Sequence, residues 1–189
     1  MKPTGTVRRS SGITRRLDEL GRVTVPKSIR RSLRIRDGDA LEIFTGHDGE
    51  IIFKKYSPIG ELTSFAEEYA ETLYKTCSLC VLICDRDGVI AAAGVSPRKD
   101  YLDKSLTEEL EELMEKRSLY TWRDGMDKVT AVQGAAMTVS CAMPILAEGD
   151  IVGAVVSLAG EKADKQLTTD TECKLIQTAA AFLGKNLES

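Results

Sequence analysis

Residues 1–56 are predicted to form a strand-rich unit that is too small to enclose a hydrophobic core alone. Apart from a basic arm over residues 1–11, the unit spans about 45 residues, and chains of that size seldom fold without a metal, disulfides or a partner chain. We therefore expect an obligate dimer in which two copies share one core. The side chains expected in this dimer core are Val23, Val25, Ile29, Leu33, Leu41, Ile43, Ile51 and Phe53.

Two β-hairpins are expected within this unit. The first pairs residues 12–17 with 22–25 around an Asp-Glu-Leu-Gly turn, and the second pairs residues 41–45 with 50–54 around a Gly-His-Asp-Gly turn. Alternating apolar and polar residues on either side of a glycine-containing turn are typical of such hairpins.

The segment between the hairpins is predicted to be a short helix with one basic face. Pro26 suits a helix start, because its missing N–H would be unpaired there in any case, and the helix is expected to run to about Arg34. At 100° per residue, Ile29 and Leu33 fall opposite the cations. A face with four cations and no carboxylate indicates contact with a polyanion. The basic face consists of Lys27, Arg30, Arg31 and Arg34.

Charge is divided unevenly along the chain. Residues 1–56 contain 13 Lys/Arg and 7 Asp/Glu, a net charge of +6, whereas residues 57–189 contain 13 and 22, a net charge of −9. This asymmetry favours nucleic-acid contact by the first domain only, double-stranded DNA being the expected partner. From charge alone, an ordinary solvated surface remains the alternative.

Residues 57–189 are predicted to form a second domain bracketed by two amphipathic helices. Ser57 and Pro58 suit the cap and the first position of one helix, and the other is expected over about residues 170–187. Their apolar stripes are expected to join dimers into a homotetramer. These stripes contain Leu62, Phe65, Tyr69 and Leu73 in the first helix and Ile176, Ala180 and Leu183 in the second.

Between these helices the pattern predicts an α+β sheet. Two hairpins are expected, one pairing residues 81–84 with 89–94 and one pairing 139–146 with 151–159. A capping box that starts at Ser105 is expected to open a central helix ending near residue 117.

The five cysteines and the single histidine do not form a recognisable metal site. Cys77 and Cys80 have the spacing of half a zinc site, but a matching second pair is missing, and structural zinc normally takes four Cys or His ligands. Packed free thiols are the favoured interpretation, with a redox role as the alternative. No metal and no cofactor are expected.

Residues 119–125 lie in the longest irregular segment of the chain, which is a candidate lid over a ligand pocket. No catalytic constellation accompanies it, so an enzyme is not expected. Local packing of its single tryptophan is the alternative. The candidate pocket residues are Cys84, Trp122, Met126 and Met137.

Neither a signal peptide nor a membrane span is evident. The amino terminus lacks an apolar segment, and no apolar run approaches the ~20 residues that cross a bilayer. We therefore expect a cytoplasmic, nucleoid-associated protein.

The stretch from residue 12 to residue 43 closely resembles the AbrB-type DNA-binding domain. It contains the motif Leu-Gly-Arg-Val-x-Val-Pro-Lys at residues 20–27 and continues to Gly-Asp-Ala-Leu-Glu-Ile at 38–43. Almost the whole chain resembles sporulation regulators in which this domain precedes a GAF-like domain. The resemblance implies a swapped-hairpin dimer, with two chains interleaving their strands, and a regulator that activates and represses forespore genes.

The resemblance also implies which residues contact DNA. The family's functional arginines match Arg15, Arg22, Arg30 and Arg31, and the residue pattern adds Arg16 and Lys27. A Gly-x-x-Arg-Arg motif occurs twice, ending at Arg9 and at Arg16, so either copy can supply the first strand. Arg8 and Arg9 therefore remain rivals of Arg15 and Arg16.

The resulting hypothesis is a sequence-selective DNA-binding transcription regulator whose C-terminal domain assembles tetramers and senses a small molecule. One alternative is an antitoxin-like protein that neutralises a partner, although such proteins usually end in a short disordered tail. Another is a cysteine-dependent reductase on a GAF-like fold, which would need several convergent cysteines.

Overall fold

The computed structural model describes residues 12–159 and 167–188. The chain packs as two compact units, residues 1–40 and residues 41–189. The predicted basic arm, residues 1–11, lies outside the described residues.

The first unit contains the predicted turn but not the paired strands on either side of it. The amide of Asp18 donates to the carbonyl of Arg22 at 3.0 Å, and that of Gly21 donates to the carbonyl of Asp18 at 3.0 Å. Gly21 has a φ of +75°, a conformation that glycine adopts without strain. Residues 12–17 and 22–25 are not assigned as strands. A strand needs a neighbour for its N–H and C=O groups, and within the described chain these two segments lack one beyond the turn.

Helix α1 (Lys27–Ser32) is shorter than expected. Pro26 is its N-cap rather than its first residue, and Arg34 lies outside it with a left-handed φ of +51°. The amide of Ile35 reaches back to the carbonyl of Arg30 at 2.8 Å. This is a Schellman ending, which usually requires glycine at the left-handed position. The expectation that the helix continues to Arg34 is therefore wrong.

The second unit begins with the second predicted hairpin. Strands β1 (Leu41–Thr45) and β2 (Ile51–Lys55) pair antiparallel, with Ile43 opposite Phe53, across a short 3₁₀ turn. This confirms the predicted hairpin, with the second strand displaced by one residue. Ile43 is 65% exposed, so the hairpin does not bury its apolar side chains within this chain.

The predicted cap at Ser57 is confirmed. Its hydroxyl accepts a hydrogen bond of 3.2 Å from the amide of Gly60, at the start of the 3₁₀ segment η2 (Pro58–Leu62). Helix α2 (Thr63–Cys77) follows. Leu62 precedes the helix as its N-cap residue and so stands outside the predicted helical stripe.

A five-stranded antiparallel sheet forms the centre of the second unit. Its strands lie in the order β4-β3-β7-β6-β5. Both predicted hairpins are confirmed, whereas the short edge strand β5 was not predicted. The strands are β3 (Cys80–Asp85), β4 (Val89–Ala93), β5 (Tyr120–Thr121), β6 (Thr138–Ala147) and β7 (Asp150–Ala159).

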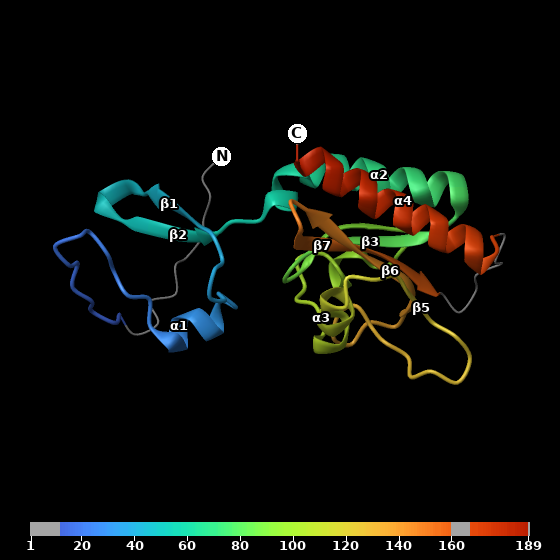
Figure 1. Cartoon of the computed structure of the whole chain (residues 1–189), viewed down its shortest axis with the longest axis horizontal. Helices are drawn as coiled ribbons and strands as arrows, with labels where there is room; N and C mark the ends of the chain where they lie inside the picture. The colour runs from blue at the N-terminus through green and yellow to red at the C-terminus, as the bar shows by residue number, and fades with distance from the viewer. Residues whose placement is uncertain (1–11, 160–166, 189) are drawn as a thin grey trace. The chain divides into compact units, whose positions relative to one another are not determined.

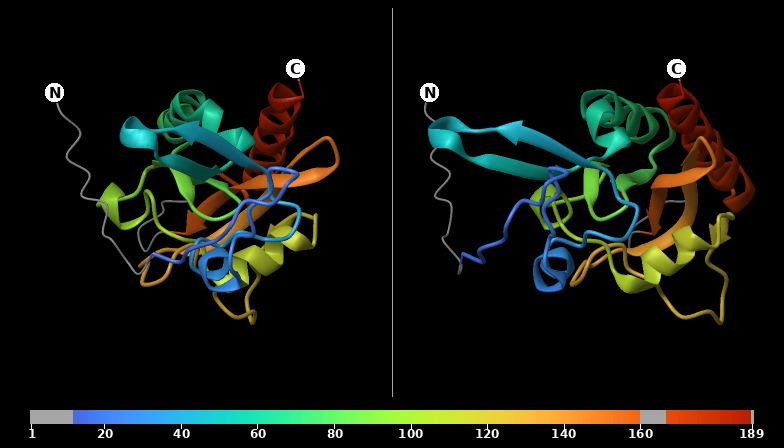
Figure 2. Two further views of the ribbon diagram at one scale, coloured as in Figure 1. Left: turned by 90° about the vertical axis from the view of Figure 1, so that its left-hand side faces the viewer. Right: turned by 60° about the vertical axis from the view of Figure 1, so that its left-hand side comes forward.

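Helices cover both faces of this sheet (Figure 1). α2 and α4 (Thr169–Leu187) lie side by side on one face, and α3 (Glu108–Glu115) packs on the other. Figure 2 shows the same arrangement from two further directions. The mixed α/β prediction for this domain is therefore correct. None of the described helices is long and apolar enough to cross a bilayer.

The cap of α3 differs from the prediction. Thr107, not Ser105, is the N-cap, and its hydroxyl accepts from the amide of Leu110 at 3.3 Å. Ser105 is instead held in extended backbone by an isolated bridge to Gly88. α3 therefore starts two residues later than predicted, and Glu108 is its first residue and not the capping-box partner of Ser105.

Candidate nucleic-acid interface

Arg22 is oriented by Asp18 across the first turn. One carboxylate oxygen of Asp18 accepts from the Arg22 side-chain Nε at 2.7 Å, and the other accepts from its backbone amide at 2.8 Å. The Asp18 carboxylate also accepts a hydrogen bond of 3.0 Å from the amide of Leu20. Among the described residues, the two terminal nitrogens of the guanidinium have no protein partner. They are therefore available to an oxygen acceptor such as a phosphate.

These contacts also change the acidity of Asp18. The backbone amide and the guanidinium of Arg22 hold the pKa of its carboxyl below the ordinary value of 3.8. Because Asp18 is on the surface, this lowered pKa reflects a local turn interaction and not packing in the core.

Helix α1 retains part of the predicted basic face. Lys27 and Arg31 are exposed and form no ion pair with any described residue, whereas Arg30 pairs with the exposed carboxylate of Asp37. Arg34 follows the helix end and no longer extends this face. Neither carboxylate partner, Asp18 or Asp37, was anticipated from the sequence. For Asp18 the signal was present, because Asp followed three residues later by Gly is a common turn signature.

Arg15 and Arg16 precede the turn and are exposed. Arg8 and Arg9 lie outside the described residues, so the choice between the two Gly-x-x-Arg-Arg copies stays open.

The predicted dimer-core side chains are not buried within the single chain. Val25, Ile29 and Leu41 are half-buried, while Leu33 and Ile51 are 58% and 65% exposed. Sequence reasoning overlooked two further exposed apolar residues on the opposite face of the hairpin. These are Phe44 and Ile52, which pair with each other across β1 and β2.

The predicted oligomerisation residues separate into two groups. Leu73 of α2 and three residues of α4 are buried in the core between these helices and the sheet. Phe65 and Tyr69 are only partly buried, and they form an aromatic cluster with the 45%-exposed Phe182, their ring centroids lying 5.8–6.1 Å apart. Phe182 was not predicted. The buried residues of α4 are Ile176, Ala180 and Leu183.

A cavity of about 640 Å³ lies between the β5 edge of the sheet and the first turns of α4. Of the predicted pocket residues it includes Trp122 alone, whose indole N–H donates to the carbonyl of Met126 at 3.1 Å. Cys84 is fully buried on the α3 side of the sheet, and Met137 packs against that same core. The polar lining missed by sequence reasoning includes Thr121, Arg123, Asp124, Cys173, Lys174 and Gln177.

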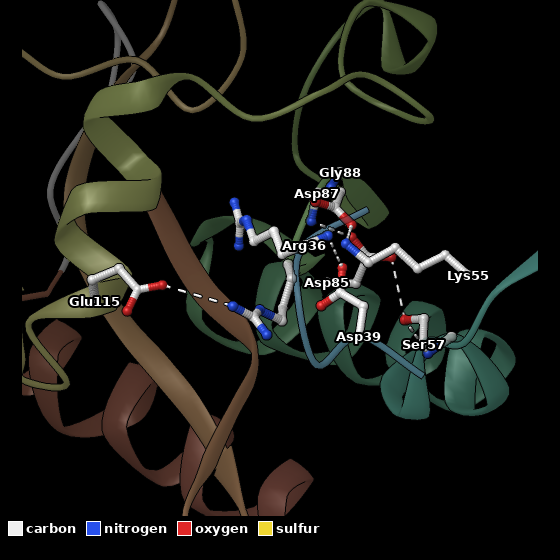
Figure 3. A network of polar contacts seen from close by, with 10 residues as sticks. Arg36, Asp39, Lys55, Ser57, Asp85, Asp87, Gly88 and Glu115 are labelled. Atoms are coloured by element: carbon white, nitrogen blue, oxygen red, sulfur yellow. Dashed lines mark hydrogen bonds and ion pairs between the residues drawn. The ribbon is translucent and has the colours of Figure 1, made fainter. Parts of the chain in front are cut away.

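The junction after β2 is tied to the turn between β3 and β4 (Figure 3). The ammonium of Lys55 pairs with Asp87, and the hydroxyl of Ser57 donates to Asp85 at 3.2 Å. Asp85 also accepts from the amides of Asp87 and Gly88 at 2.8 and 2.7 Å, which fixes the turn. The chain leaving the second hairpin is thus anchored by two polar contacts.

Two family models match the chain. One, described as "Stage V sporulation protein T C-terminal, transcription factor", matches residues 61–188. The other, described as "Antidote-toxin recognition MazE, bacterial antitoxin", matches residues 14–61.

Curated relatives extend these matches. Stage V sporulation protein T of Bacillus subtilis (strain 168) is 49% identical over 182 residues, which cover 95% of this chain and 99% of that protein. The transition state regulatory protein AbrB of the same organism is 54% identical over 50 residues, 26% of this chain and 51% of that protein. Among solved structures, residues 122 to 287 of a methyl-accepting chemotaxis protein align with a TM-score of 0.48 and 16% identity, over 67% of this chain and 88% of that one. That likeness is too remote to assign anything to this chain.

The fold and these matches define a transcription regulator with an AbrB-like N-terminal domain and a C-terminal sheet-plus-helix domain. The chain belongs to the stage V sporulation protein T family. It is a DNA-binding transcription regulator of sporulation, as the resemblance implied.

Proposed function

We propose that residues 1–56 of two subunits interleave as a swapped-hairpin dimer and that this dimer grips DNA. The support is that parts of residues 12–56 lack partners within the described chain. Residues 12–17 and 22–25 lack strand partners within the described chain, and apolar residues such as Ile43 and Ile51 stay exposed. A second copy of the chain would supply both missing partners. Its strands would hydrogen-bond to the unpaired segments, and its apolar side chains would cover the exposed ones.

In this proposal the DNA contacts come from exposed arginines and one lysine. The observation that carries it is the orientation of Arg22, whose Nε is held by Asp18 while its terminal nitrogens stay available. Lys27 and Arg31 add charges without carboxylate partners. Arginine forks suit phosphates and guanine edges, and lysine serves mainly as a point charge. The proposed contact residues are Arg15, Arg16, Arg22, Lys27, Arg30 and Arg31, with Arg8 and Arg9 as alternatives for the first pair.

Residues 57–189 act in this proposal as a GAF-like regulatory domain that joins two dimers into a tetramer. The partly exposed aromatic cluster of Phe65, Tyr69 and Phe182 supports a contact surface on α2 and α4. Exposed aromatic residues that gather on one face are enriched at subunit interfaces. A tetramer engages two DNA segments and so raises avidity without new contacts.

The cavity beside β5 supports small-molecule sensing. Its volume, about 640 Å³, falls within the range of small-molecule sites, and its lining combines the indole of Trp122 with side chains of both charges. We place the protein in the cytoplasm, associated with the nucleoid, where it activates some sporulation genes and represses others without catalysis.

An antitoxin-like role is the second candidate, and the MazE match over residues 14–61 favours it. That match covers the DNA-binding region alone. A protein that copurifies stoichiometrically through residues 57–189 and is released by a competing C-terminal domain would support the antitoxin role over the regulatory one.

The proposal is tested by fluorescence anisotropy with the full chain and duplex DNA from a sporulation promoter. Arg22→Ala and Arg30→Ala each weaken binding about tenfold or more, as loss of a charge-assisted contact worth roughly 1.5–3 kcal/mol requires. Lys99→Ala is the matched control, because it removes an exposed cation from the other domain. Equal affinities for all four proteins would refute the assigned interface.

A further inference from the structure

Three polar side chains stand in one row across the sheet. Ser157 of β7 is paired with Cys141 of β6, and Cys141 is paired with Thr121 of β5. Directly opposite residues on neighbouring antiparallel strands project from the same face. The row therefore lies on the face that α4 covers.

α4 contacts both ends of this row. The hydroxyl of Ser157 donates to Glu172 at 2.6 Å, and Thr121 Oγ1 lies 3.1 Å from the Cys173 sulfur. Cys141 stands between these two contacts. The Cys141 and Cys173 side chains are themselves in hydrogen-bond contact.

The two thiols differ in their access to small molecules. Cys173 is only 8% exposed but lines the cavity beside β5, whereas Cys141 is 0% exposed and does not line it. Burial raises the pKa of the Cys141 thiol, and contact with Cys173 raises it further. A reagent that enters the cavity therefore meets Cys173 first.

We propose that Cys173 is a site of reversible thiol modification by small-molecule disulfides, with Cys141 as the resolving thiol. The Cys173 thiol loses its proton and attacks one sulfur of the disulfide, which forms a mixed disulfide and releases the first thiol. Cys141 then loses its proton and attacks the Cys173 sulfur, which releases the second. The two protein thiols are oxidised to one disulfide, and the reagent is reduced to two thiols.

The cavity also indicates the class of reagent. Arg123 and Asp124 place opposite charges at its lining, and Trp122 adds an apolar surface. This combination suits the zwitterionic ends of an amino-acid-derived disulfide. The other three cysteines do not line this cavity. Cys84 is fully buried in the core on the α3 side, Cys80 donates to the Gly94 carbonyl at 3.1 Å, and the Cys77 sulfur lies 3.4 Å from the Thr76 hydroxyl.

The consequence of oxidation is local. A Cys141–Cys173 disulfide would tie the second turn of α4 covalently to β6, where Thr121 and Ser157 now provide only hydrogen bonds. Amides in the first turns of α4 should then exchange with solvent more slowly in the oxidised protein than in the reduced one.

The test treats the folded full chain with oxidised glutathione and maps the products by non-reducing peptide mass spectrometry. The wild type should yield a Cys141–Cys173 cross-link that dithiothreitol reverses. Cys141→Ser should instead retain glutathione on Cys173, because no resolving thiol remains. Cys173→Ser should leave Cys141 unmodified, and Cys84→Ser, the matched control, should cross-link as the wild type does.

The half-buried Cys77 serves as an internal standard for reagent activity. Modification of Cys77 with Cys173 unmodified in the Cys141→Ser protein would overturn the proposal. So would a wild type that accumulates glutathione on Cys173 without forming the cross-link. Because the wild type and Cys141→Ser suffice for these outcomes, the test does not depend on the folding of Cys173→Ser.

Discussion

The Ser157 hydroxyl donates a 2.6 Å hydrogen bond to the carboxylate of Glu172, a side chain that is only 5% exposed. This contact joins β7 to the first turn of α4 and gives a buried carboxyl group a hydrogen-bond partner. The same hydroxyl oxygen lies 3.3 Å from the carbonyl oxygen of Cys141, a longer contact that shares its single hydrogen. A buried acceptor that loses its donor keeps the full cost of desolvation.

Ser157→Ala should therefore lower the free energy of unfolding by about 1–3 kcal/mol. Urea denaturation followed by circular dichroism measures it. Ser118→Ala, at an exposed position, is the control and should change little. A Ser157→Ala protein as stable as this control would show that Glu172 finds another partner.

At Gly184, α4 lies close against the backbone of β6. A Cβ atom at this position would lie 2.1 Å from the carbonyl oxygen of Leu146, a backbone atom that cannot rotate away. Gly184→Ala should destabilise the domain by about 1–3 kcal/mol or more, although alanine is the better helix former. Gln177→Ala, on the exposed face of the same helix, should not destabilise it. Thermal unfolding of both variants compares them; a Gly184→Ala protein that melts with the wild type would contradict this packing.

The Asp18 turn should depend on pH in a defined direction. Because the folded-state pKa of Asp18 lies below 3.8, the contact is fully present above that value and is lost as the pH falls through the lowered pKa. Carbonyl NMR should show Asp18 titrating below 3.8, with the amides of Leu20 and Arg22 shifting in parallel. In Asp18→Ala these amide shifts should disappear. Titration of Asp18 at or above its ordinary value would rule out the contact with Arg22.

The aromatic cluster on α2 and α4 gives a direct test of assembly. Phe182→Glu places a charge in the proposed tetramer surface and should convert tetramers into dimers, measured by light scattering at micromolar concentration. Because Phe182 is 45% exposed, the subunit fold should tolerate the change. Gln177→Ala is again the control. A Phe182→Glu protein with the molar mass of the wild type would exclude this surface.

The second-domain sheet was predictable because its signals are local. Each main hairpin combines an apolar run with a turn rich in Gly and Asp, and the structure places β3–β4 and β6–β7 where these signals lie. β5 has only two residues, and its pairing with β6 depends on tertiary register. No local sequence pattern predicts a strand of two residues.

The N-terminal unit was predictable in its turn and helix but not in its pairing or its ending. Strands over residues 12–17 and 22–25 need a partner that the described chain does not supply. The left-handed Arg34 ends α1 without the glycine that normally marks such a position. Both differences, the unpaired segments and the left-handed helix end, depend on interactions that a short stretch of sequence does not show.

The pocket was only partly predictable. Alternation along a strand decides which face of the sheet each side chain occupies, and the choice of Cys84 as a pocket residue did not take this into account. Cys84 shares the parity of Leu82 and therefore faces α3, whereas the cavity lies beside α4. Trp122 was predicted because it lies in the longest irregular segment of the chain. Cys173 was missed because it lies on α4, about fifty residues further along the chain.

The salt dependence of DNA binding tests the central claim most directly. For the full chain on duplex DNA, the logarithm of the association constant should fall linearly with the logarithm of salt concentration. Arg22→Ala removes one phosphate contact from each of two subunits, so the slope should become shallower by about 2 per dimer. An unchanged slope and affinity for Arg22→Ala, with Lys99→Ala as reference, would contradict an arginine surface shared by two interleaved subunits.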